Sequence, residues 1–328
     1  MGRGDTWNEL VRKFQIMCKL SLREADSLAV TVLVDNYTDV LLIESTDVVK
    51  RPPTSPPNLL LAEHGFSCLL EVRAGLEEHA VLMDAGVSTT CLFHNAKVLR
   101  LDLSKIESVI LSHGHFDHFG ALMELLGTGT KVTSLILHPD VFLKRRLNLP
   151  PIGHHVHFPA LDEAALAETG VELRKAREAS TLASGLILVS GEVPRKTDFE
   201  TGFPWAEAKI DDKWVVDPFH DDQAVAVKVK GRGIVVISGC SHAGIINMVK
   251  HLQKITGTSK VHAVLGGFHL TEPIFEPIIE PTIDEMRGIG PDFVVPMHCT
   301  GWKAINQFAD EMSEQFLLNT VGTTYVFR

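Results

Sequence analysis

The amino-acid sequence predicts a mixed α+β protein, built as one large domain or as about two folding units. The chain has 328 residues. Because a domain commonly has about 100–200 residues, this length suits about two folding units or one unusually large domain. Short β-branched and apolar runs dominate the first third of the chain, whereas strand-like and helix-like segments alternate in the last third. Hydrophobic residues make up 45% and charged residues 22%, which is typical of globular proteins.

Residues 1–28 form the first predicted element, an amphipathic helix. Trp7, Leu10, Val11 and Phe14 recur near a 3.6-residue period. We expect this helix to be an extension that packs on the domain body, residues 29–328, or on another subunit. It is therefore a candidate contact for a homodimer.

The domain body is predicted from apolar runs separated by turn residues. The proline-rich segment 51–57 is expected to be an exposed loop, as a connector or as a lid. Strands are predicted at 29–35, 66–73, 79–86, 107–114, 133–140, 224–229, 233–239, 261–267 and 291–299, with the pair at 224–239 forming a hairpin. Helices are predicted at 120–126, 161–170, 243–255, 277–288 and 301–313.

Charge and cysteine content restrict the class of protein. The chain has 31 Lys and Arg against 41 Asp and Glu, a formal net charge of −10, so nucleic acid is an unlikely partner. The five cysteines form no CxxC pair, which predicts a reducing compartment. No signal peptide and no apolar run of about 20 residues is visible, so we expect a cytoplasmic protein that does not span a membrane.

The strongest motif is an H-x-H-x-D-H run between a predicted strand and a predicted helix. His113 and His115 lie two residues apart, so an extended backbone points both toward one metal ion. Asp117 and His118 follow where the chain turns into the helix, toward an adjacent position. One loop thus offers ligands for two divalent ions about 3.5–4 Å apart. Imidazole and carboxylate donors favour Zn²⁺, with Mn and Fe as alternatives.

This run resembles the defining motif of the metallo-β-lactamase superfamily, and the resemblance covers roughly residues 30–328. It implies a four-layer α/β/β/α sandwich with a dinuclear metal site at one edge. Other stretches resemble the branch that contains dihydropteroate-synthase-like proteins of the methanopterin pathway. They are VLVDNYTD (32–39), AEHGFSCLLE (62–71), SGEVPR (190–195), DDQAVAV (221–227), ISGCSHAGIIN (237–247), GGFHL (266–270) and PMHCTG (296–301).

Two further metal ligands are expected at strand ends. His242 should join His113 and His115, and His298, which matches the last histidine of the superfamily, should join Asp117 and His118. Cys240 occupies the position where the superfamily usually has a bridging aspartate. The bridging ligand is thus open: Asp222 is the favoured carboxylate, with Asp221 and the Cys240 thiolate as alternatives.

Residues around the metals are assigned from the same resemblance and from their positions. Asp84 is expected to orient a ligand histidine by hydrogen bonding. His269 and His64 are expected to face the substrate as catalytic groups, together with Asp117. Arg195 and Glu192 are candidate substrate-binding residues. The cluster His154, His155 and His157 is placed on a loop or insertion at the rim of the site.

The predicted activity is metal-dependent hydrolysis by a metal-activated hydroxide. Phosphodiesters are the expected substrates, with esters and lactones as side substrates. The alternative is a pterin-transferring synthase related to methanopterin biosynthesis. The expected partner is therefore a small phosphoester or a pterin-like molecule.

Overall fold

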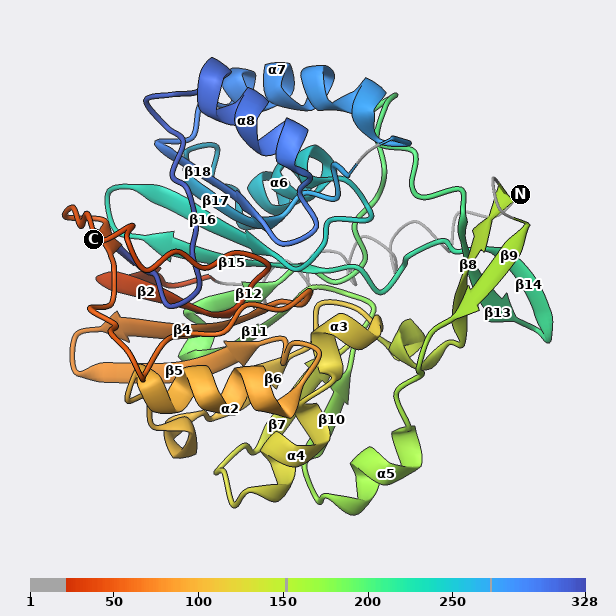
Figure 1. Cartoon of the computed structure of the whole chain (residues 1–328), viewed down its shortest axis with the longest axis horizontal. Coiled ribbons are helices and arrows are strands. Elements are labelled where there is room, and N and C mark those ends of the chain that lie inside the picture. Colours follow the sequence, from red (N-terminus) through yellow and green to blue (C-terminus); the bar gives the residue numbers. More distant parts are fainter. Residues whose placement is uncertain (1–21, 151–152, 272) are drawn as a thin grey trace, which may run out of the picture.

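The computed structural model describes residues 22–150, 153–271 and 273–328. Two β-sheets face each other in the middle of the molecule, and helices cover the outer face of each (Figure 1). The predicted four-layer α/β/β/α sandwich is confirmed. No helix within these residues is long and apolar enough to cross a membrane.

The first sheet has eight strands, in the order β10-β7-β6-β5-β4-β2-β19-β3. Its strands in chain order are β2 (Ser27–Val34), β3 (Val49–Lys50), β4 (Ser67–Ala74), β5 (Glu77–Met83), β6 (Ser108–Ile110), β7 (Ser134–Leu137), β10 (Glu172–Lys175) and β19 (Thr324–Phe327). The predicted strands of the first third are all present. The last strand, β19, pairs antiparallel to β2 and lies next to the edge strand β3.

The second sheet has seven strands, in the order β11-β12-β15-β16-β17-β18, and β1 pairs with β15. Its strands are β1 (Glu24–Ala25), β11 (Ser180–Leu182), β12 (Ile187–Val189), β15 (Ala224–Val229), β16 (Gly233–Ser238), β17 (Val261–Gly267) and β18 (Phe293–Met297). The hairpin β15–β16 is antiparallel, as predicted. Strands β16, β17 and β18 run parallel, so their carboxyl ends meet at one edge.

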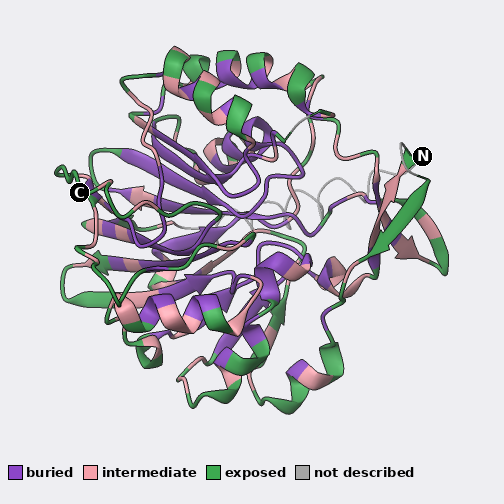
Figure 2. Ribbon diagram, viewed as in Figure 1, coloured by how far each residue is buried: buried purple, intermediate pink, exposed green. Residues whose placement is uncertain are grey.

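Helices pack by their apolar faces on the outside of the two sheets. On the first sheet lie α2 (Thr89–Val98), α3 (Phe116–Phe119), α4 (Leu122–Gly127) and α5 (Glu163–Glu168); on the second lie α6 (Ile245–Thr256), α7 (Ile279–Ile289) and α8 (Trp302–Glu311). Buried residues run through the strands and the inner helix faces, and exposed residues follow the outer faces (Figure 2). One apolar cluster fills the space between the sheets, and one more lies under each helical layer.

A third, smaller sheet projects from the sandwich and was not predicted. It has four strands in the order β14-β13-β8-β9, namely β8 (Arg145–Leu149), β9 (His154–His157), β13 (Ala206–Ile210) and β14 (Lys213–Val216) (Figure 1). Its strands are short. β9 and β14 are largely exposed and β8 and β13 only partly buried, so their sequences lack a clear apolar period. His154, His155 and His157 therefore lie in an exposed strand, β9, and not in a loop, whereas the alternative expectation of an insertion agrees with this projecting sheet.

The amino-terminal prediction also needs correction. Residues 1–21 of the predicted helix lie outside the described residues. The remainder is not helical: β1 pairs with β15, and β2 begins at Ser27 rather than at the predicted boundary. Pairing with β4 and β19 buries the apolar residues of β2, and this tertiary contact outweighs the helical pattern.

Candidate metal centre

The H-x-H-x-D-H run lies in the turn between β6 and α3. His115 is in the extended conformation at the N-cap of α3, and Asp117 lies in the first helical turn. All four motif residues, His113, His115, Asp117 and His118, are buried. The strand-loop-helix arrangement predicted for the motif is present, and it directs the four side chains into the gap between the two sheet edges.

A first set of donors comes from His113, His115 and His242. The Nε2 atoms of His113 and His242 are 3.2 Å apart, and the His115 ring centroid is 4.8 Å from that of His242. His115 Nε2 is buried and has no hydrogen-bond partner among the described residues. Buried nitrogens that converge without partners fit a metal ion, which would satisfy them.

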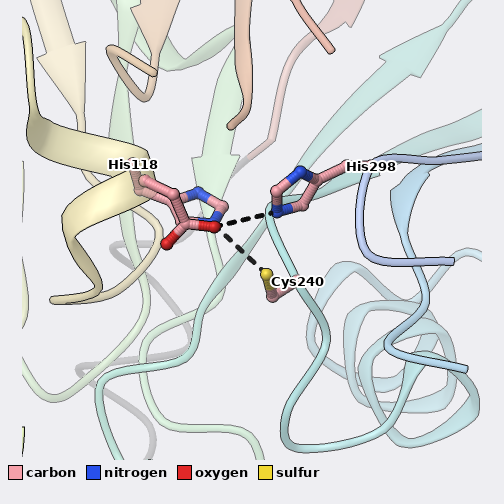
Figure 3. Close-up of side chains that lie close together, drawn as sticks. His118, Cys240 and His298 are labelled. Atoms are coloured by element: carbon pink, nitrogen blue, oxygen red, sulfur yellow. Dashed lines mark hydrogen bonds and ion pairs between the residues drawn. The ribbon is translucent and has the colours of Figure 1, made fainter. Parts of the chain in front are cut away.

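A second set comes from Asp117, His118, His298 and Cys240. One donor atom of each lies within 4.8 Å of the others. Asp117 Oδ2 is 3.4 Å from His298 Nε2 and 3.6 Å from His118 Nε2. His118, Cys240 and His298 point toward one another from three separate segments (Figure 3). Imidazole, carboxylate and thiolate donors of this kind suit Zn²⁺.

Cys240 lies close to donors of both sets. Its sulfur is 3.2 Å from His118 Nε2 and also groups with His113 and His242. Asp222 belongs to no such donor group in the described chain: its Oδ2 accepts a 2.6 Å hydrogen bond from the Ala243 amide, and its Oδ1 is buried without a hydrogen-bond partner among the described residues. The geometry favours Cys240 as the shared ligand, and the choice between Cys240 and Asp222 stays a prediction.

Asp221 is also engaged elsewhere, in a buried ion network. Its carboxylate accepts hydrogen bonds from the Gly114 amide and from Arg145 Nη2, at 2.8 and 2.7 Å. Arg145 also donates from Nε to Asp217 Oδ2 at 2.7 Å. Gly114 leaves room for the guanidinium, since a Cβ there would lie 2.5 Å from Arg145 Nη1. The network therefore holds the backbone of the motif loop at Gly114, which lies between His113 and His115.

Protonation of the first donor set favours metal binding. Burial lowers the pKa of His113, His115 and His242 well below the usual value, so these rings are neutral near pH 7. Burial opposes ionisation of Asp117, but the neighbouring His118 and His298 hold its pKa well below its usual range. Neutral imidazoles and an ionised carboxylate are the forms that bind metals.

A cavity of about 400 Å³ opens directly onto these donors. Its floor contains His115, Asp117, Cys240 and His242, and its walls are mostly aromatic and aliphatic. The described lining contains neither Lys nor Arg. The apolar wall residues are Phe116, Leu147, Leu149, Phe158, Phe203, Trp205, Pro273, Ile274 and Phe275.

Comparisons with known proteins agree with this geometry. The family model described as the metallo-β-lactamase superfamily matches residues 69–246. The chain belongs to the metallo-β-lactamase superfamily. A Methanocaldococcus jannaschii protein named 7,8-dihydropterin-6-methyl-4-(β-D-ribofuranosyl)-aminobenzene-5′-phosphate synthase is 31% identical over 258 residues, covering 78% of this chain and 87% of that protein. The predicted resemblance to the methanopterin-pathway branch is thus confirmed.

Two further matches extend the comparison. A second protein of the same organism, described as uncharacterized, is 31% identical over 249 residues and covers 76% of this chain and 88% of its own. A crystal structure described as a metal-dependent hydrolase of the β-lactamase superfamily superposes with a TM-score of 0.70 at 23% identity, covering 92% of this chain and 98% of that one. This last similarity concerns the fold.

Asp84 contacts the metallo-β-lactamase motif as the sequence predicted. Its Oδ2 is 2.7 Å from His118 Nδ1, and its Oδ1 accepts a hydrogen bond from the Ser112 amide at 2.7 Å. Asp84 has a φ of 58°, so the chain turns sharply after β5. The hydrogen bond orients the His118 ring so that Nε2 faces the donor cluster.

Asp35 and Asn36 perform a similar task for His298, and sequence reasoning missed them. Asp35 Oδ1 accepts a 2.8 Å hydrogen bond from the His298 amide, and Asn36 Nδ2 donates to the His298 carbonyl at 2.7 Å. In the sequence, both read as turn residues after a strand. The signal was a carboxylate at a strand end, which the fold brings to His298 from 263 residues away.

His64 and His269 line the cavity, in keeping with a role near the substrate. His64 Nε2 is 3.5 Å from Asp117 Oδ2. Both ring nitrogens of His269 are buried without a hydrogen-bond partner in the described part of the chain. Its ring centroid lies 4.2 Å from that of His242, so it stands beside the first donor set.

Arg195 and Glu192 lie elsewhere, since neither is among the described residues that line the cavity. Glu192 Oε1 pairs with His138 Nε2 at 3.0 Å and with Arg177 Nη1 at 2.7 Å. Arg195 points its Nη2 to the His242 carbonyl at 3.5 Å. The substrate-binding role of Arg195 and Glu192 stays a prediction, because in the described chain both side chains contact protein groups.

Proposed function

We propose that this protein is a dinuclear metal-dependent hydrolase of phosphodiesters that carry an aromatic or apolar group. The observation that supports it most directly is the pair of donor sets that share Cys240 at the floor of the cavity. Two adjacent sets suit the paired ions of two-metal hydrolases. The thiolate and imidazole donors favour zinc over manganese, with iron as an alternative.

The chemistry follows from the positions of the residues. When bound, two divalent ions supply Lewis acidity and activate water for attack on phosphorus. Asp117 lies among His64, His118 and His298, and its ionised carboxylate would orient the attacking water. Burial and the neighbouring His298 lower the pKa of His64, so its neutral ring could accept a proton from the attacking water at the cavity wall.

The cavity supports the substrate class. Its apolar walls would bury an aromatic ring or an alkyl group, while the metals at the floor would hold the phosphoryl oxygens. Uncharged esters and lactones fit the same walls and are proposed side substrates. The absence of Lys and Arg from the described lining agrees with a small molecule as partner and disfavours a polynucleotide.

The proposal is tested by metal counting and by a substrate panel. We expect at least two zinc ions per chain, one for each donor set, and turnover of bis(p-nitrophenyl) phosphate above that of p-nitrophenyl phosphate. Asp117→Asn should lose at least 100-fold in kcat/KM, or about 2.7 kcal/mol. His79→Gln, on β5 and paired with Glu107, is the matched control. Metal-loaded protein that cleaves no phosphoester, ester or lactone would overturn the proposal.

A second candidate, pterin transfer, is favoured by two observations. The relative that is 31% identical is named as a synthase with pterin and aminobenzene groups in its product, and the cavity walls offer aromatic surfaces for such rings. In this reaction the bond from the pterin methylene to a diphosphate would break, a bond from the methylene to an aryl carbon or nitrogen would form, and that carbon or nitrogen would lose its proton to a base or to solvent. Product that requires both co-substrates would support it, whereas diphosphate release from the pterin alone would count against it.

A further inference from the structure

We infer that Cys240, His269 and Cys299 form an additional metal position, which lies beside the two donor sets of the H-x-H-x-D-H motif and shares Cys240 with them. These residues follow β16, β17 and β18, three neighbouring parallel strands whose carboxyl ends meet at one edge. The two sulfurs and one ring nitrogen of His269 all lie within 4.8 Å of one another. The inference concerns metal binding and does not depend on which reaction the protein catalyses.

The spacing is close to that of an occupied zinc site. Sulfur ligands about 2.3 Å from a tetrahedral zinc lie roughly 3.8 Å apart, and a nitrogen ligand is slightly nearer. Donor atoms within 4.8 Å therefore need to move by about 1 Å or less to close on one ion. Side-chain rotation alone can supply such a movement.

Two independent features indicate that a ligand belongs there. The ring nitrogens of His269 are buried and unpaired within the described residues, although such groups normally find a partner. The His269 backbone has a φ of 49°, a conformation that is uncommon for residues other than glycine and often marks functional positions. The Cys299 thiol is free and is 3.4 Å from the Cys240 carbonyl oxygen, a weak contact that metal binding would replace.

Gly267 provides the space for the Cys299 sulfur. A Cβ at this position would lie 2.6 Å from that sulfur and 3.2 Å from the Cys240 Cα. The absence of a side chain at the end of β17 thus allows Cys299 to approach Cys240 across the intervening strand.

The position has the composition of a catalytic zinc site. Two thiolates and one imidazole leave a fourth coordination site open for water or a substrate oxygen. Cys240, His269 and Cys299 all line the 400 Å³ cavity, so the open site faces the space in which the substrate would lie. Because Cys240 is shared with the motif ligands, an ion here would be coupled to the one at Asp117, His118 and His298. Soft donors would select Zn²⁺ or Co²⁺ over Mn²⁺ and Mg²⁺.

Cobalt absorption tests the inference without an activity assay. The full chain, stripped of metal, is titrated with Co²⁺, and thiolate-to-cobalt charge-transfer absorption is followed in the near ultraviolet. Cys240 would contribute to all three positions and Cys299 to one. We therefore expect Cys299→Ser to lower this absorption at saturation by about a quarter and Cys240→Ser to lower it by about three quarters or more. Cys91→Ser is the matched control, since Cys91 is a buried free thiol that contacts the Leu61 carbonyl away from the cavity.

Two results would overturn the inference. One is Cys299→Ser with the same cobalt absorption as the unaltered chain. The other comes from a measurement that needs no folded variant: zinc-edge X-ray absorption of the unaltered, zinc-loaded protein. A zinc ion with two sulfur neighbours supports the position, and a spectrum with at most one sulfur per zinc rejects it. If hydrolysis is absent while two-sulfur coordination is found, the proposed function fails and the metal position stands.

Discussion

The metal centre and the cavity wall differ in chemistry and in origin. The centre is built from buried polar side chains at the ends of strands of the two main sheets, including His113, His118 and His298. The wall facing it is apolar, and much of it comes from the small third sheet and its flanking segments, through Leu147, Phe158 and Trp205.

This difference separates reactivity from recognition. Hydrogen bonds at the strand ends fix some of the candidate metal donors: Asp84 orients the His118 ring, and Asp35 holds the backbone of His298. The third sheet supplies shape and apolar surface, which select the part of the substrate that does not react. Substitutions at three positions, Arg145, Glu200 and Trp205, test how far the metal centre and the cavity wall act separately.

Arg145 links the third sheet to the motif loop, and its substitution should cause the largest loss of stability. It begins β8 of the third sheet, yet its guanidinium pairs with Asp217 and Asp221 and contacts the metal loop. Arg145→Met would leave two buried carboxylates unpaired, and we expect a loss of about 3–5 kcal/mol in the free energy of unfolding. Urea denaturation measures this. Arg146→Met, which removes a partly buried pair with Glu207, is the control and should cost much less.

An equal loss of stability in these two variants would show that the third sheet is held by general packing. In that case the ion network would not be a specific link to the metal loop.

Glu200 should make the free energy of unfolding depend on pH, by about 3 kcal/mol. Its buried carboxyl accepts hydrogen bonds from the Ile246 and Asn247 amides at the start of α6, behind the metal centre. Burial raises its pKa to about 7 from the usual 4.5. The folded state therefore holds a proton that the unfolded state releases, so this contribution is full below pH 4.5 and is lost as pH rises to 7.

Glu200→Gln should flatten this part of the stability profile between pH 4.5 and 7, as measured by urea denaturation at several pH values. Glu163→Gln, at an exposed position on α5, is the control. An unchanged slope in Glu200→Gln would mean that Glu200 is ionised in the folded protein throughout this range.

Substitution of Trp205 should have the smallest effect, and this effect should be limited to substrate binding. It lines the cavity at the entry to β13 and touches none of the donor groups. If the hydrolase proposal holds, Trp205→Ala should raise KM for an aryl phosphodiester about 10-fold, or about 1.4 kcal/mol, while kcat and the values for a methyl phosphodiester change little. Trp302→Ala, at a site 72% exposed on α8, is the control. A fall in kcat for both substrates would show that the wall also positions the reacting group.

The sequence by itself determined the metallo-β-lactamase fold and most of the metal donors. The proximity of candidate ligands such as His113 and His115 can be predicted from the sequence, because they lie two residues apart in one short loop and stay close in any fold. The main strands can be predicted from the sequence, because strands buried on both faces require continuous apolar runs, as in β15 and β16.

Only the tertiary structure decided which groups beyond the motif join the centre. It placed the Cys240 sulfur close to donors of both sets, and it paired one Asp222 oxygen with the Ala243 amide. It brought Asp35 to His298, turned Glu192 away to Arg177, and folded a polar segment into the third sheet. These outcomes depend on contacts between residues far apart in the chain, and local sequence patterns carry no information about such contacts.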